Sequence, residues 1–160
     1  VLKDLRTGTE KEFEFPLKCP ICESLVVKPE GEAISRCTNN ECFAKEREAF
    51  IHFVSKGAMD IDGLGEKVVD ALIEEGFVKD FADFYTLTID DLEELPLFQE
   101  KRANNLFNNI QQSKVIDLDK FLFALGIRHL GAQTSEEVAR FVKNRIENRE
   151  LRIENKELGI

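Results

Sequence analysis

The sequence around residue 60 reads Met59-Asp60-Ile61-Asp62-Gly63-Leu64-Gly65-Glu66-Lys67 and joins two segments whose apolar residues recur at helical spacing. The spacing predicts a helix over 45–56, ending near Gly57, and a second helix that continues to Gly76. Two glycines on either side of one leucine permit positive φ angles and leave the backbone uncovered. The stretch therefore predicts a tight hairpin between two helices, with Leu64 anchored in the core.

A hairpin of this kind can bind phosphate, because bare N–H groups at the start of the second helix can point at an anion. The candidate contacts in this hairpin are Gly63, Leu64, Gly65 and Lys67. The alternative is an ordinary connection between helices in which glycine only ends the first helix.

Two segments further along the chain repeat the pattern. The first, at 90–110, has Leu97 and Gln99 where the glycines would stand, so it either contacts phosphate through Lys101 and Arg102 or only packs. The second, at 121–142, is interpreted as an intact hairpin running from Gly126 to Gly131. Its candidate contacts are Gly126, Arg128, His129, Gly131, Gln133 and Thr134, with an exposed turn residue as the alternative for His129.

The chain has 13 phenylalanines, and most of them recur at helical spacing. We expect these rings to form the core rather than to stack on bases. The set expected in the core includes Phe81, Phe84, Phe98, Phe107, Phe121 and Phe123.

All four cysteines precede the helices, as Cys19-Pro-Ile-Cys22 and, after 14 residues, Cys37-Thr-Asn-Asn-Glu-Cys42. Short apolar runs at 25–27 and 33–35 on either side of a turn predict two small strands between the pairs. Two close pairs across a hairpin suit tetrahedral zinc, and four thiolates leave no open position for a catalytic water. The pattern therefore predicts a closed structural zinc site.

Three other uses of the cysteines remain open. Disulfides would require an oxidising compartment, which we do not expect, because residues 1–18 do not resemble a secretion signal. A redox Cys-Pro-Ile-Cys site would be followed by a long helix, whereas here a second cysteine pair follows. Four buried free thiols are the third alternative.

The composition is that of a globular chain with enough apolar residues for a core: 160 residues, 42% hydrophobic. No run approaches the roughly 18 apolar residues that span a bilayer, so we expect a cytoplasmic protein. The first residue is not Met, and we expect both ends to be cut edges of a longer chain.

The net charge of −9 argues against a polyanion as partner, but the charge is unevenly distributed. Residues 60–100 hold 13 acidic and 2 basic residues, which leaves 20 basic and 18 acidic elsewhere. An acidic face directed away from a ligand is compatible with local basic contacts. We therefore expect weak, salt-sensitive binding by this piece alone.

Taken together, these motifs closely resemble the zinc finger and helix-hairpin-helix domain of bacterial NAD-dependent DNA ligases, over about residues 16–143. The resemblance is carried by the Cys-Pro-Ile-Cys motif, by the stretches 36–39 and 51–55, by Ala58 to Lys67, and by Phe123 to Gly131. It implies a mainly α fold with a tetracysteine zinc ribbon followed by an array of helix-hairpin-helix motifs.

The resemblance also implies a division of the chain. Residues 1–18 would be the tail of a preceding OB-fold and its linker, 19–44 the zinc finger, and 45–143 a helix-hairpin-helix domain of about three units. Residues 144–160 would form a polar helical tail, which is either a truncated or a diverged fourth unit.

In such ligases, an adenylation domain uses NAD and a divalent metal to seal nicks in duplex DNA during replication and repair. This chain lacks the Lys-x-Asp-Gly motif of that domain, since Asp60-Ile61-Asp62-Gly63 has no lysine. The resemblance therefore implies a monomeric, non-catalytic segment whose partners are nicked double-stranded DNA, recognised without sequence preference, and the other domains of the ligase. The alternatives are a similar module of another DNA repair protein and a protein-binding scaffold.

Overall fold

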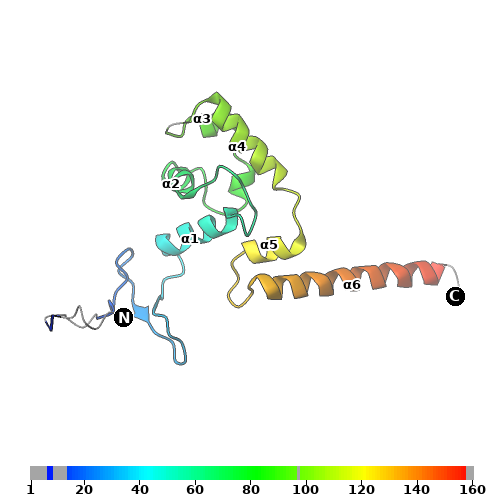
Figure 1. The fold of residues 1–160 in the computed structure, drawn as a ribbon, viewed down its shortest axis with the longest axis horizontal. Helices are drawn as coiled ribbons and strands as arrows, with labels where there is room; N and C mark the ends of the chain where they lie inside the picture. Colours follow the sequence, from blue (N-terminus) through cyan, green and yellow to red (C-terminus); the bar gives the residue numbers. More distant parts are fainter. Residues whose placement is uncertain (1–6, 9–13, 97, 158–160) are drawn as a thin grey trace. The chain divides into compact units, whose positions relative to one another are not determined.

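The computed structural model describes residues 7–8, 14–96 and 98–157, and it divides the chain into two compact units, 1–46 and 47–160. Across these described residues the fold is mainly helical, as predicted, with a two-stranded sheet near the N-terminus (Figure 1). None of the helices described is both long and apolar enough to cross a bilayer. The predicted OB-fold tail falls largely on residues 1–6 and 9–13, which lie outside the described residues.

The first unit contains a small antiparallel ribbon. Strand β1 (Val26–Val27) pairs with β2 (Arg36–Cys37), and Val26 lies opposite Cys37. The second strand was predicted at 33–35, which is wrong: Ile34 lies before the strand and is 60% exposed. The pairing register explains the difference, because it includes Cys37 itself in the ladder and so carries the second cysteine pair back toward the first.

Helix α1 (Phe43–Val54) starts two residues before its predicted position and ends two residues earlier. It begins directly after Cys42, whose carbonyl accepts the amides of Lys45 and Glu46. After it, the amides of Met59 and Ile61 return to the carbonyls of Phe53 and Val54 at 3.0 and 3.1 Å. The chain therefore folds back on the end of α1 before the next helix.

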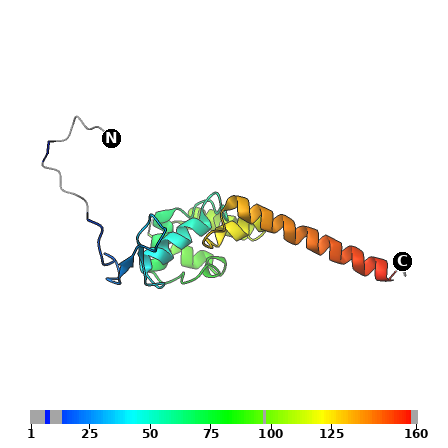
Figure 2. The ribbon, with the colours of Figure 1, turned by 90° about the horizontal axis from the view of Figure 1, so that it is seen from below.

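The second unit is built from helices and a 3-10 turn, and buried apolar residues between Phe50 and Ala124 form its core. After α1 these are α2 (Glu66–Glu74), the 3-10 turn η2 (Asp83–Tyr85), α3 (Ile89–Glu93), α4 (Glu100–Gln112), α5 (Leu118–Ala124) and α6 (Ala132–Glu157). Figures 1 and 2 show α5 and α6 as an antiparallel pair, and α6 continues without a break past the predicted domain end at residue 143.

Aromatic rings fill the centre of this core. Phe84 is fully buried, and Phe53 stacks on Phe81 with ring centroids 4.5 Å apart. Phe50 meets the edges of the Phe81 and Phe84 rings. The prediction that the phenylalanines form the core is wrong for Phe121, which is 40% exposed. Its helix α5 makes its close backbone contacts with α6 alone among the described elements, and so cannot bury every face.

Several carboxylates of the acidic stretch have structural partners. Asp91 and Thr88 form a capping box at the start of α3, and Asp83 accepts the amides of Lys79 and Asp80 at 2.7 and 2.9 Å. Asp70 accepts the guanidinium of Arg47, which joins α2 to α1. These roles explain part of the local acidity without any ligand, because carboxylates satisfy unpaired amides at helix starts.

Candidate metal centre and nucleic-acid interface

The structure brings the four cysteine thiols together. All four Sγ atoms lie within 4.8 Å of one another, with 3.9 Å between Cys19 and Cys42 and 3.4 Å between Cys22 and Cys37. Tetrahedral zinc with Zn–S bonds of about 2.3 Å requires sulfur atoms about 3.8 Å apart. The donor set and its spacing therefore fit a zinc ion bound by all four predicted ligands. Four protein ligands would leave no coordination position open to a substrate.

Two local structures position these thiols. At the first pair, the amide of Cys19 donates to the Ser24 carbonyl and the amide of Glu23 donates to the Cys19 carbonyl, at 2.8 and 2.9 Å. Glu23 adopts a left-handed φ of 57° to close this turn. At the second pair, Cys37 belongs to β2 and Cys42 immediately precedes α1. The ribbon and the helix start thus bring the pairs face to face.

The local environment affects the thiols in opposite directions. Hydrogen bonds from the side chain and backbone of Ser24 lower the pKa of Cys22 to about 6, whereas burial raises the pKa of Cys37 to about 11. Backbone hydrogen bonds lower the pKa of Cys19, and burial raises the pKa of Cys42. A divalent cation at the centre of the four sulfurs would favour the thiolate form of all of them.

The three predicted hairpins share one backbone turn, which we name turn 1 (61–65), turn 2 (95–99) and turn 3 (127–131). In each, the amide of the fourth residue donates to the carbonyl of the first, and the carbonyl of the fifth accepts an amide from the helix that follows. The first bond joins Leu64 to Ile61, Phe98 to Leu95 and Leu130 to Ile127, and the second joins Val69 to Gly65, Ala103 to Gln99 and Ser135 to Gly131, all at 2.9 to 3.2 Å.

This correspondence changes the interpretation of turn 3. Its third residue is His129, with a φ of 68°, in the place that Gly63 occupies in turn 1 with a φ of 92°. Gly131 corresponds to Gly65. Gly126 lies before the turn, where its φ of 62° and its amide bond to the Phe123 carbonyl end α5. The shared Ile-x-x-Leu-Gly pattern of the two segments is the sequence signal that identifies His129 as the equivalent of Gly63.

Turns 1 and 3 present unpaired amides at the start of a helix. Gly63 and Gly65 are exposed while Leu64 between them is buried, and no acceptor within the described residues serves the amides of Gly65, Glu66 and Lys67. At the start of α6, residues 131–134 are exposed, and their amides also have no acceptor within the described residues. Such groups favour an anion through their dipoles and their unsatisfied donors.

Helix α4 supports turn 1 from behind. The side-chain amide of Asn109 donates to the carbonyl of Asp62 at 2.9 Å, and Leu106 lies close enough that a Cβ at Gly63 would be 3.4 Å from its Cδ1 atom. The turn is therefore held in place by residues 40 or more positions away in the chain, contacts that no local sequence pattern predicts.

The charges beside the turns differ. Turn 1 has Lys67 but also Asp62 and Glu66, and the carboxylate of Glu66 lies 3.7 Å from Arg47. Residues 126–134 around turn 3 contain Arg128 and His129 and no acidic residue. Turn 3 is therefore the electrostatically better place for a phosphate.

Turn 2 differs from the other two in its side chains. Phe98 takes the position of Leu64, and the guanidinium of Arg102 lies over its ring, 4.1 Å from the centroid. Lys101 is exposed at the start of α4. Leu97, which stands where turn 1 has Gly63, lies outside the described residues. The stacking of Arg102 on Phe98 favours packing as the role of this turn.

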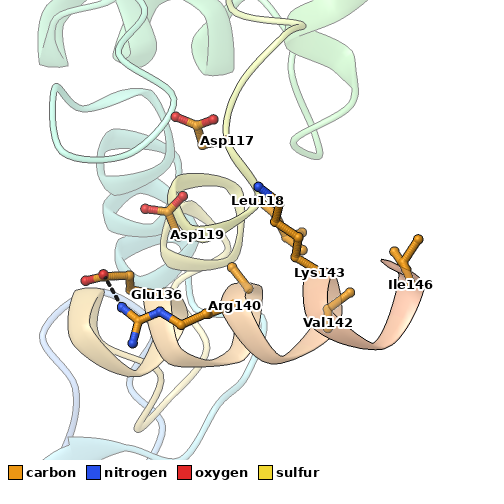
Figure 3. Close-up of a pocket in the computed structure, with 9 residues that line it drawn as sticks. Asp117, Leu118, Asp119, Glu136, Arg140, Val142, Lys143 and Ile146 are labelled. Atoms are coloured by element: carbon orange, nitrogen blue, oxygen red, sulfur yellow. Dashed lines mark hydrogen bonds and ion pairs between the residues drawn. The ribbon is translucent and has the colours of Figure 1, made fainter. Parts of the chain in front are cut away.

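A groove of about 630 Å³ lies between α5 and α6 (Figure 3). Leu118, Ala139, Val142 and Ile146 are its apolar lining residues. Its charged lining residues are Asp117, Asp119, Glu136, Arg140 and Lys143, of which Glu136 and Arg140 are paired at 2.7 Å. None of the predicted DNA contacts lines this groove.

Comparison with known proteins agrees with the resemblance inferred from the motifs. Residues 18–44 match the family described as the NAD-dependent DNA ligase C4 zinc finger domain. Over 139 residues, the chain is 49% identical to the DNA ligase of Bacillus cereus (strain AH187) and to that of Bacillus subtilis (strain 168). Each match covers 87% of this chain and 21% of the ligase, so the chain spans about a fifth of the length of these curated relatives. The predicted resemblance is confirmed.

Proposed function

We propose that this chain, a relative of one part of the NAD-dependent DNA ligases, is the segment by which such a ligase holds the backbone of nicked duplex DNA. The observation that carries the proposal is the pair of exposed helix starts at turns 1 and 3, whose amides have no acceptor within the described residues. Amides bind a phosphate oxygen whatever the base beside it, so this interface would be independent of sequence.

Turn 3 is the stronger of the two contacts in this proposal. Amides of residues 131–134 would bind one phosphate, with Arg128 and His129 supplying side chains and Gln133 and Thr134 lying beside the same helix start. Turn 1 would bind a second phosphate through Gly63, Gly65 and Lys67, with Leu64 anchoring it in the core. Lys101 and Arg102, which follow turn 2 in α4, would add little.

The zinc site would act by folding the ribbon and not by chemistry. Four thiolates complete a tetrahedral shell, so the metal would lack an open position for a reacting group. Sealing of the nick, with its NAD and divalent metal, would belong to other domains of a bacterial, cytoplasmic ligase, and this segment alone would be inactive.

Titration of the zinc-loaded chain against a nicked duplex at several salt concentrations tests the proposal. We expect weak binding. The logarithm of the association constant should fall linearly with the logarithm of the salt concentration, with a slope of about −0.9 for each phosphate neutralised. Single-stranded DNA of the same length serves as the comparison ligand. Binding that is absent at low salt, or that does not change with salt, would contradict a backbone interface.

One observation favours a second candidate function, the binding of another protein. The groove between α5 and α6 combines an apolar lining with Asp117 and Asp119 at the start of α5 and with Glu136, Arg140 and Lys143 on α6. An apolar contact of this kind would tolerate salt, unlike a phosphate contact. Absence of DNA binding at low salt in the titration above would therefore favour this second candidate.

A further inference from the structure

His52 connects two parts of the second unit that are far apart in the chain. Its Nε2 atom lies 2.9 Å from the carbonyl oxygen of Phe123, at the C-terminal end of α5. A carbonyl can only accept, so Nε2 donates this bond. The imidazole also meets the Phe123 ring edge-on, with centroids 4.8 Å apart. One half-buried side chain of α1 thus both caps and packs against α5.

The adjacent glycines fit the same contact. A Cβ on Gly126 would lie 3.4 Å from Cδ2 of His52, and a Cβ on Gly57 would lie 3.6 Å from the Phe123 ring. Gly126 therefore allows α5 to end directly against the imidazole. The contact is specific to this pair of elements, since α5 otherwise makes its close backbone contacts with α6 among the described helices.

The last turn of α1 also holds turn 1. The amides of Met59 and Ile61 bond to the carbonyls of Phe53 and Val54, the two residues that follow His52. Turn 3 begins four residues after Phe123, whose carbonyl His52 caps. Both turns are consequently attached to residues 52–54, turn 1 by backbone bonds and turn 3 through the His52 side chain, next to Ala124, which is fully buried in the shared core.

We propose that His52 is a positioning residue that holds turn 3 at a fixed distance from turn 1, so that both can contact one DNA backbone at once. Two linked contacts bind more tightly than either alone only while their spacing matches the ligand. Freeing α5 from α1 would lower the affinity without altering any group that touches DNA. The benefit for binding rests on the proposed function, whereas the attachment itself does not.

Two variants separate the hydrogen bond from the ring contact. His52→Phe keeps an aromatic ring and removes the donor, and His52→Gln keeps a donor near the position of Nε2. Tyr85→Phe is the matched control, because it removes a side-chain hydrogen bond of the same unit, the 3.3 Å bond to Ser113, in which neither residue belongs to α5. The full zinc-loaded chain is used throughout.

The first measurement is ¹⁵N relaxation of the backbone amides, without DNA. In the wild type we expect residues 118–140 to tumble with the amides of α2. In His52→Phe the two groups should show different rotational correlation times, and His52→Gln and Tyr85→Phe should resemble the wild type. If His52→Phe melts as a whole, Phe123→Leu, which weakens the ring contact from the α5 side, takes its place with the same expected result.

The second measurement is affinity for nicked duplex. His52→Phe should bind about two- to tenfold more weakly, the effect of one lost hydrogen bond. Gly131→Val should also reduce DNA affinity less in the His52→Phe variant than in the wild type. The reason is that turn 3 would already contribute less to DNA binding in that variant. Unchanged relaxation in both His52→Phe and Phe123→Leu overturns the positioning role. If the wild type fails to bind DNA, the proposed function is wrong, and relaxation alone decides whether His52 holds α5.

Discussion

At the scale of single residues, Gly63 and Gly131 are glycines for different reasons. Gly63 has a φ of 92°, and a Cβ there would lie 3.4 Å from Leu106, whereas a Cβ on Gly131 would meet nothing within 4 Å. Only the first position therefore needs glycine for folding. At Gly131, the absence of a side chain leaves the backbone amides accessible, and this is what glycine contributes there.

We expect Gly63→Val and Gly131→Val to separate stability from binding. Gly63→Val should destabilise the chain by about 1–2 kcal/mol or more, because an L residue is strained at this φ. Gly131→Val should change stability by less than about 1 kcal/mol and still weaken DNA binding, because its side chain would cover the amides at the start of α6. Thermal unfolding and a DNA titration measure the two effects. Wild-type affinity in Gly131→Val would remove turn 3 from the interface.

The sequence predicted these positions incompletely. Glycine spacing identified turn 1 correctly but paired Gly126 with Gly131 in turn 3, where the structure gives Gly126 the role of ending α5. His129 adopts the left-handed conformation usually taken by glycine, so a search for glycines could not identify its structural role. The contact between His52 and Phe123 spans 71 positions, and no local pattern predicts it.

At the scale of elements, α1 and α2 are joined by an ion pair. The Arg47 guanidinium donates to both carboxylate oxygens of Asp70 and lowers the pKa of that carboxyl group. A folded-state pKa below the unfolded value of about 3.9 means that the pair stabilises the fold above that value. Its contribution is lost as the pH falls through the folded pKa.

Asp70→Asn should therefore be less stable than the wild type at pH 7, and the difference should shrink at pH 3. Urea unfolding followed by helical circular dichroism at both pH values measures it. Glu136→Gln is the control, because its pair with Arg140 is highly exposed and should contribute little. An equal difference between Asp70→Asn and the wild type at pH 7 and pH 3 would contradict the assigned role of the carboxylate.

The ribbon depends on its metal site more than on its packing. Its strands contain two residues each, and Leu25 and Ile34 are more than half exposed, so little apolar surface stabilises it. We expect Cys37→Ser to lose zinc and to unfold residues 19–42, because zinc in comparable small domains supplies roughly 10–16 kcal/mol. Metal content and the NMR signals of the ribbon report the result. A zinc-loaded, folded ribbon in the variant would show that three thiolates suffice.

Helix periodicity predicted the elements better than their ends. It placed α1 two residues too late, because it did not include the cap that the Cys42 carbonyl provides. It also placed the second strand too early, because the register depends on the cysteines and not on the apolar run at 33–35. The cysteine spacing, in contrast, predicted a site whose four ligands the structure brings together.

At the scale of the whole chain, the net charge of −9 gives little guidance to function. Part of the acidic stretch at 60–100 has partners within the protein, since the carboxylates of Asp83 and Asp91 accept backbone amides and that of Asp70 pairs with Arg47. Residues 126–134 around turn 3 include no acidic side chain. Local charge at each turn is therefore a better guide to an anion site than the total.

The common backbone of the three turns has a consequence for how such a protein changes over time. Turn 2 keeps the hydrogen bonds of turns 1 and 3 but has Phe98 and Gln99 in place of a leucine and a glycine. On the proposed function, substitutions at a turn would therefore remove a phosphate contact while these hydrogen bonds stay in place. On the same proposal, relatives with the same turns would differ in how many phosphates they contact.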